Sequence, residues 1–179
     1  MTPRHRVYLS YHHDDDGAYR DVFEARLRDA YHHPLPSSKT LALDPTLCTE
    51  TLRQKIRNEH LRDTSVTVVL IGLRTCQSKH VDWEIASSIR DTELGPRSGL
   101  LGILLPTHPA FGGSHYDPTT IPARLQDNLA RGFATLRSWS DDPVLVGEWI
   151  HLAYVHAKRL HPINSRPPLG RTDSGPWLD

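Results

Sequence analysis

The sequence has little cysteine, no long hydrophobic run and no excess of either charge. Only two cysteines occur among the 179 residues, Cys48 and Cys76, and neither belongs to a CxxC pair. This usage indicates neither a disulfide framework nor a zinc site, and we expect a reducing, cytoplasmic location. The longest apolar runs, 66–72 and 100–105, are far shorter than the roughly 20 residues that span a bilayer. We therefore expect no membrane partner.

The charges cancel, with 21 Lys and Arg against 21 Asp and Glu. Nucleic-acid binding would need a basic stripe, and the nearest candidate, 53–57, is balanced by Glu50 and Glu59. We therefore expect no nucleic-acid partner. The 12 histidines form no HExxH or HxH spacing, so they predict no metal site.

The chain does contain an alternation of strand-like and helix-like segments, which predicts an α/β domain with a parallel sheet. Right-handed crossovers favour the doubly wound, flavodoxin-like order 2-1-3-4-5 for five strands. We assign residues 1–160 to this domain. Residues 161–179 hold several prolines and no periodic apolar face, which predicts a mobile tail. The predicted strands are 6–11, 39–43, 65–72, 99–105 and 134–139, and the predicted helices are 18–31, 49 or 50 to 61, a helix capped by Ser78 that extends to about 93, 121–131 and 143–160.

A sheet of this order binds ligands at the carboxyl ends of its strands, where the winding direction reverses. That crevice lies between the first and third strands, with residues 10–14 and 73–75 as its walls and the loop 43–51 as a lid. The Ser10 hydroxyl, at a strand end, is expected to reach either a loop backbone or a ligand phosphate. The candidate substrate-contacting residues in these segments are Ser10, Tyr11, His12, Asp44 and Thr75.

Glu84 is the candidate catalytic carboxylate. With Ile85 at the centre of the buried face of its helix, Glu84 lies about 100° away, on the flank of the apolar stripe. It is within two turns of the helix N-terminus, where the dipole favours an ionised carboxylate. The neighbouring Trp83 offers an aromatic face to a base or a nicotinamide ring. A solvated helix glutamate and a core tryptophan are the alternative interpretations of these two residues.

Three segments carry a family resemblance: 7–14 (VYLSYHHD), 65–72 (SVTVVLIG) and 81–85 (VDWEI), with Thr75 between the last two. They resemble the TIR-like ThsB proteins of the Thoeris anti-phage defence system. The resemblance extends over roughly the first half of the chain, and Glu84 matches the family's catalytic glutamate. The family usually has a basic and an aromatic residue just before Val-Asp-Trp-Glu, and here Lys79-His80 occupies that place.

The resemblance implies a TIR fold and an enzyme that breaks the N-glycosidic bond of NAD+ and releases nicotinamide. It also implies that ADP-ribose is joined into a cyclic isomer, a second messenger for an effector protein. NAD+ is then the substrate, and no cofactor is expected. Such TIR enzymes often become active on self-association, so a homo-oligomer is a further expected partner.

The implied chemistry agrees with a carboxylate in the crevice. Nicotinamide leaves as a neutral pyridine, so the reaction needs no general acid. An ionised carboxylate beside the ribose hydroxyls stabilises the oxocarbenium-like ribose electrostatically. The nucleophile is water in hydrolysis, or a group of the same ADP-ribose in cyclisation, and the sequence leaves both outcomes open.

Several other functions are compatible with such a sheet. A non-catalytic TIR-like signalling module is the main alternative, and a deoxyribosyltransferase-like enzyme also uses a glutamate on a similar sheet. A phosphorylation receiver needs an aspartate at the end of the third strand, where this chain has Gly72-Leu73-Arg74. A redox dinucleotide-binding domain is excluded because no GxGxxG follows the first strand.

Overall fold

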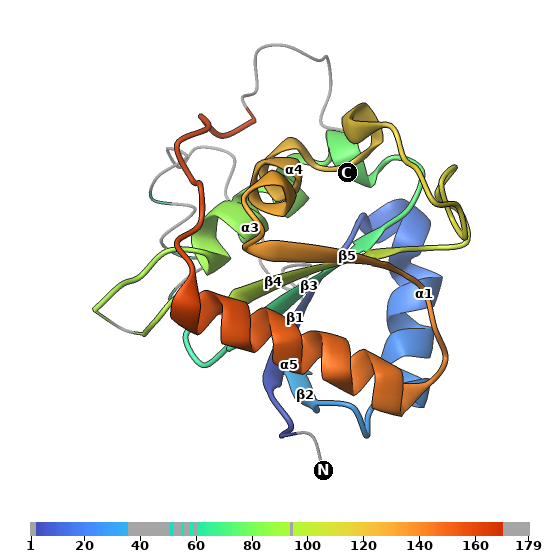
Figure 1. Cartoon of the computed structure of the whole chain (residues 1–179), viewed down its shortest axis with the longest axis horizontal. Coiled ribbons are helices and arrows are strands. Elements are labelled where there is room, and N and C mark those ends of the chain that lie inside the picture. The colour runs from blue at the N-terminus through green and yellow to red at the C-terminus, as the bar shows by residue number, and fades with distance from the viewer. Residues whose placement is uncertain are drawn as a thin grey trace.

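A parallel sheet forms the centre of the molecule (Figure 1). The computed structural model describes residues 3–35, 51, 55, 58, 61–93 and 95–169. In this part of the chain the strands are hydrogen-bonded in the order β2-β1-β3-β4-β5, and every neighbouring pair is parallel. The predicted α/β class with a parallel sheet is confirmed. The strands are β1 (Arg6–Ser10), β2 (His32–Leu35), β3 (Val66–Ile71), β4 (Gly99–Leu104) and β5 (Ala134–Ser138).

The regular part of the sheet consists of four strands, β1, β3, β4 and β5, which pair without interruption. The edge strand β2 adds two paired positions with a shifted register. We predicted the second strand at 39–43, which lies outside the described residues, and assigned 32–51 to a loop with at most that one strand. The error has a physical reason: Pro34 cannot donate to a ladder, but an edge strand tolerates proline.

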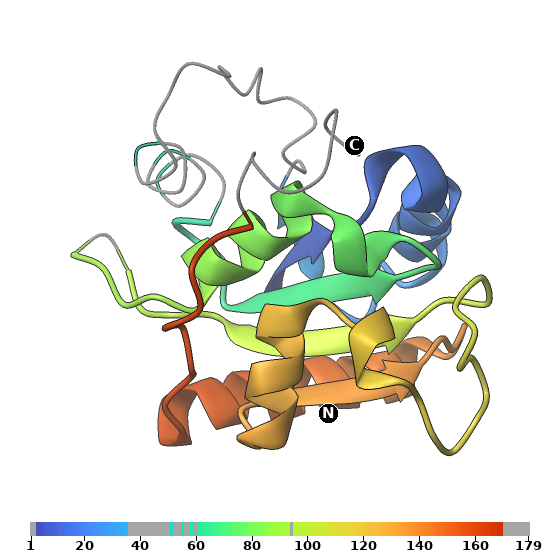
Figure 2. The same ribbon diagram turned by 90° about the horizontal axis from the view of Figure 1, so that it is seen from above.

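The helices cover both faces of the sheet, with α1 and α5 on one face and α3 and α4 on the other (Figures 1 and 2). The predicted helix from 49 or 50 to 61 lies mostly outside the described residues, although Thr51, Lys55 and Asn58 are helical. No helix in the described part is both long enough and apolar enough to cross a membrane. The helices are α1 (His13–Arg26), α3 (Lys79–Ser88), α4 (Ala123–Ala130) and α5 (Pro143–Arg159), with 3-10 turns η2 (Thr75–Gln77) and η3 (Pro118–Thr120).

The two faces of the sheet have separate hydrophobic cores, and the side chains of β3 contribute alternately to one and the other. Its residues Val66, Val68 and Leu70 pack in the core beneath α1 and α5. Val69 and Ile71 point the other way, into the core beneath α3 and α4. A strand buried on both faces reads as a continuous apolar run, which is why β3 was readily predicted.

The beginning of the predicted mobile tail is packed against the domain. The side-chain amide of Asn128 accepts from the Ile163 N–H at 2.9 Å and donates to the Ile163 carbonyl at 2.8 Å. Arg166 donates twice to Asp127, at 2.9 and 2.8 Å. The prediction is therefore corrected for 161–169, because polar side chains rather than an apolar face attach this segment. Residues 170–179 lie outside the described residues.

Candidate active site

Glu84 is directed from α3 toward β1. Its side chain is 1% exposed, and the hydroxyl of Tyr8 donates to Oε1 at 2.6 Å while that of Ser10 donates to Oε2 at 2.5 Å. Bonds of this length are typical of hydroxyl donors to a carboxylate. We expected both residues at the crevice, but with the Ser10 hydroxyl bonded to a loop backbone or a ligand phosphate, and in this structure it donates to Glu84 instead. We did not predict Tyr8, although the period-two alternation of a strand puts it on the same face as Ser10.

The surroundings of Glu84 differ from the predicted ones. We expected α3 to be amphipathic with Glu84 on the flank of its buried stripe, but Lys79 and all residues 81–88 are buried. The sheet lies on one side of α3, while α4 and residues 163–169 lie on another (Figure 2). Ser78 begins the helix by accepting from the Val81 N–H at 3.2 Å, as predicted for its cap.

Thr75 ties the end of β3 to α1. Its hydroxyl accepts from the Gly72 N–H at 2.8 Å and donates to Asp16 Oδ2 at 2.9 Å. Asp16 is fully buried, and this burial raises the pKa of its carboxyl group. The Asp16 carboxyl group packs closely against Gly72, since a Cβ at residue 72 would lie 2.1 Å from Asp16 Oδ1. In this structure the Thr75 hydroxyl therefore holds two elements together, and its contact with a substrate stays a prediction.

The two predicted walls of the crevice are adjacent and joined by an ion pair. Arg74 donates to Asp15 at 2.6 Å from Nε and at 2.5 Å from Nη2, and this guanidinium lowers the pKa of Asp15. His12, predicted as a substrate contact, is 2% exposed and caps α1 by accepting from the Asp15 N–H at 3.3 Å. This cap explains why α1 begins at His13 rather than at the predicted residue 18.

A series of aromatic rings leads from the end of β1 to α3. The ring centroids of Tyr11 and His13 lie 4.7 Å apart. The His80 ring lies 6.4 Å from that of His13 and 5.9 Å from that of Trp83, again between centroids. His80 precedes Glu84 by four residues, which puts both on the same side of the helix. His80 contacts the rings on both sides of it in this cluster. Neither histidine was among our predicted contacts.

Trp83 and Tyr11 are buried, at 3% and 4% exposure. The Trp83 indole N–H donates to the carbonyl of Leu169 at 3.3 Å, so its polar edge is held by the C-terminal segment. Asp44 lies outside the described residues. Within the ranges that the structure describes, no group of three or more His, Cys, Asp or Glu side chains is gathered as for a metal ion.

The strand order, with a buried glutamate on the helix after β3 held against β1, defines a doubly wound α/β domain with a candidate carboxylate site. The family model of the Thoeris protein ThsB, TIR-like domain, matches residues 8–110 of the 179. The match covers more than half of the chain, and the chain belongs to this family. It includes Ser10, Thr75, Trp83 and Glu84. No curated protein matches the chain.

Proposed function

We propose that this chain is a Thoeris-type NAD+ nucleosidase and ADP-ribosyl cyclase with Glu84 as its catalytic carboxylate. One observation carries the proposal: a carboxylate only 1% exposed, which accepts hydroxyl hydrogen bonds from Tyr8 and Ser10 at the ligand-binding end of a doubly wound sheet. A glutamate is rarely buried in this way unless its carboxylate has partners, which here are the two hydroxyls of β1. Family membership supports the same conclusion.

The hydroxyls of Tyr8 and Ser10 give Glu84 the same kind of hydrogen bond that ribose hydroxyls give. In our proposal the ribose of NAD+ takes over such bonds when it enters. The carboxylate then stabilises the positive charge that develops on the ribose as the C–N bond breaks. The electron pair of that bond leaves with the nicotinamide nitrogen, which becomes neutral.

The second half of the reaction replaces the lost bond at the same ribose carbon. Attack by water gives ADP-ribose and releases one proton to solvent. Attack by a hydroxyl or ring nitrogen of the same ADP-ribose gives a cyclic isomer. We propose that the cyclic product reaches a separate effector protein by diffusion, with NAD+ as substrate and no cofactor.

The rings of His13, His80 and Trp83 form an aromatic cluster, and the last two belong to α3, the helix that carries Glu84. Planar nicotinamide and adenine rings stack on such rings. Because Glu84 and Trp83 are both buried in the described structure, substrate entry requires that this cluster opens. We propose that self-association of the chain produces the open form.

A non-catalytic TIR-like signalling module is the alternative function. The observation in its favour is that each Glu84 oxygen already accepts a hydrogen bond, as in a carboxylate with a purely structural role. The two functions make different predictions for Glu84→Gln. If the chain is a signalling module, wild type and a folded Glu84→Gln variant both leave NAD+ intact. If it is an enzyme, only the wild type consumes NAD+.

The test is nicotinamide release from NAD+, followed by chromatography and mass spectrometry, for wild type, Glu84→Gln and Glu148→Gln. Glu148 is an exposed glutamate on α5, so it controls for the loss of a helix carboxylate. We expect release by wild type and Glu148→Gln but not by Glu84→Gln. Deoxynucleosides serve as competing substrates, and their cleavage in preference to NAD+ would favour the transferase-like alternative.

A further inference from the structure

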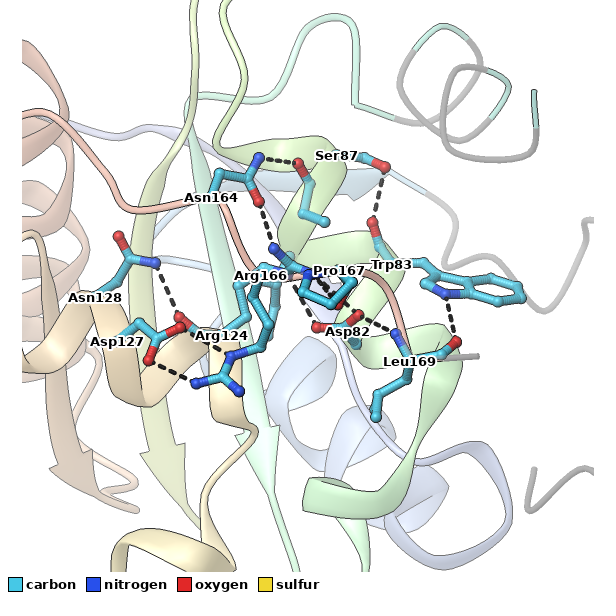
Figure 3. A network of polar contacts seen from close by, with 12 residues as sticks. Asp82, Trp83, Ser87, Arg124, Asp127, Asn128, Asn164, Arg166, Pro167 and Leu169 are labelled. Atoms are coloured by element: carbon cyan, nitrogen blue, oxygen red, sulfur yellow. Dashed lines mark hydrogen bonds and ion pairs between the residues drawn. The ribbon is translucent and has the colours of Figure 1, made fainter. Parts of the chain in front are cut away.

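Residues 163–169, here named the C-terminal strap, run across α3 and α4 and are bonded to both (Figure 3). On the α4 side, Asn128 bonds the Ile163 backbone and Asp127 bonds the Arg166 guanidinium. On the α3 side, the Asn164 side-chain amide donates to the Ala86 carbonyl at 2.9 Å. The strap therefore connects α3, the helix that carries Glu84, with its neighbour α4.

Beneath the strap lies a buried ion pair between α3 and α4. Arg124 is fully buried and Asp82 is 4% exposed, with Nε to Oδ1 at 2.9 Å and Nη2 to Oδ2 at 3.3 Å. A buried pair of this kind is stable only if its remaining donors and acceptors are also satisfied. The strap supplies those partners.

Three strap residues complete the hydrogen bonds of this pair (Figure 3). Asn164 Oδ1 accepts from Arg124 Nη1 at 2.7 Å, and the Pro167 carbonyl accepts from Nη2 at 3.3 Å. The Leu169 N–H donates to Asp82 Oδ2 at 3.1 Å. Removing the strap would therefore leave buried charges without partners.

The strap also reaches the residues next to the proposed catalytic carboxylate. Leu169 holds Asp82 through its N–H and the Trp83 indole through its carbonyl. Glu84, the following residue, is held by Tyr8 and Ser10 of β1. Three consecutive side chains of α3 are thus anchored in different directions, which fixes the rotation of the helix about its axis.

We propose that the C-terminal strap positions Trp83 and Glu84 for the reaction and that Asn164 is a positioning residue. This inference rests on the proposed function. A helix rotation of about 10° moves a carboxylate that lies about 6 Å from the axis by about 1 Å. An error of that size at a reacting centre costs up to about 100-fold in rate. The strap opposes such a rotation through its bonds to Asp82 and Trp83, the two residues before Glu84.

The experiment compares Asn164→Ala with wild type in the full chain. Asn164 is partly exposed and belongs to neither hydrophobic core, so the variant is expected to fold. We expect kcat for nicotinamide release to fall about 10-fold or more, with KM for NAD+ changed by less than about two-fold. Asn164→Asp keeps the oxygen that accepts from Arg124 and is expected to recover part of kcat.

A spectroscopic measurement separates positioning from a general loss of stability. The indole N–H signal of Trp83 in a ¹H–¹⁵N spectrum, assigned with Trp83→Phe, is expected to shift in Asn164→Ala. The matched control is Arg97→Ala, which removes bonds from Arg97 to the Ala157 and Leu160 carbonyls just before the strap. This control is expected to leave both the Trp83 signal and kcat unchanged.

The outcomes distinguish failure of this inference from failure of the proposed function. If the Glu84-dependent kcat of Asn164→Ala stays within about two-fold of wild type, or falls no further than that of Arg97→Ala, the inference is overturned. If the wild type shows no Glu84-dependent turnover, the proposed function fails. In that case the strap's hold on Trp83 is judged by the indole signal, and an unchanged signal in Asn164→Ala overturns it as well.

Discussion

At the scale of single residues, Asp15 and Asp16 are adjacent carboxyl groups in opposite environments. Hydrogen bonding to the Arg74 guanidinium holds the pKa of Asp15 below its usual value of 3.8. Burial raises the pKa of Asp16 above the same value, only partly offset by the hydrogen bond from Thr75. The two residues must therefore affect stability with opposite dependence on pH.

The first prediction concerns Asp16→Asn. A carboxyl group whose pKa is raised on folding contributes stability below its unfolded pKa and loses that contribution as the pH rises through its folded pKa. Asp16→Asn should therefore become more stable relative to wild type as the pH rises from about 4 to about 7. Urea unfolding across this range measures the difference.

Asp15→Asn is the matched control for that series. The lowered pKa of Asp15 means that its contribution is present above the unfolded pKa and lost as the pH falls through the folded pKa. Asp15→Asn should therefore be destabilising near neutral pH and approach wild type in acid. Two variants with the same pH trend would contradict the assigned environments.

The second prediction concerns the donors to Glu84. Tyr8→Phe removes a hydroxyl that donates to a buried carboxylate oxygen, and leaving such an atom short of a partner costs about 1–3 kcal/mol. The free energy of unfolding, measured in urea, should fall by that amount. Tyr116→Phe removes a longer and partly exposed bond to Gln126 and should cost less than about 1 kcal/mol. Equal losses in both variants would count against a special role for the Tyr8 hydroxyl.

Residue roles were only partly predictable from the sequence. The proximity of Ser10 and Glu84 followed from strand order and helix phase, both of which are local patterns. His12 and Thr75 were predicted as substrate contacts, but their side chains cap a helix and join β3 to α1. Polar residues at strand ends bind ligands in some proteins and bond neighbouring backbone or side-chain groups in others. Only the fold determines which groups they reach.

At the scale of the elements, the contact between α1 and the end of β3 depends on Gly72. A Cβ at this position would lie 2.1 Å from Asp16 Oδ1, so α1 would have to move away. The third prediction is that Gly72→Ala destabilises the fold by about 1–3 kcal/mol, as overpacked sites do. The double variant Gly72→Ala/Asp16→Ala should recover most of the lost free energy of unfolding, measured in urea.

Gly17→Ala is the comparison for that substitution. Gly17 lies within α1, and nothing lies within 4 Å of the position that its Cβ would occupy. Alanine is favoured over glycine in a helix by about 0.5–1 kcal/mol, so this variant should be more stable than wild type. A destabilised Gly17→Ala would contradict the described course of α1.

Element positions were predicted well where burial imposes a strong pattern. β3 and β4 are buried along their whole lengths and were predicted within a residue or two. The edge strand β2 was not predicted, since the pairing of His32–Leu35 with β1 has no hydrophobic signature. The burial of nearly all of α3 was also missed, because the partners of Asp82 are polar and come from distant segments.

At the scale of the whole molecule, the C-terminal strap shows why some packing is invisible in the sequence. Its attachments are hydrogen bonds with Asn128, Arg124 and Asp127, which are distant in the chain. Such pairings leave no periodic apolar pattern. Proline content therefore predicted a mobile tail where a packed segment occurs.

The fourth prediction concerns assembly. If self-association opens the site around the buried Glu84, nicotinamide release per molecule should rise with protein concentration. The rise should coincide with oligomer formation in light scattering of the same samples. Release per molecule that stays constant over a wide concentration range would contradict the role of assembly but would leave the catalytic proposal intact.

The central claim is that the Glu84 carboxylate promotes cleavage of the nicotinamide bond, and its most direct test is one ratio of rates. The ratio compares nicotinamide release from NAD+ by wild type and by Glu84→Gln, measured on samples with matched unfolding curves and at concentrations that permit assembly. Loss of a group that stabilises transition-state charge predicts a ratio of about 100 or more. A ratio near one, with both proteins folded and releasing nicotinamide, would contradict the account.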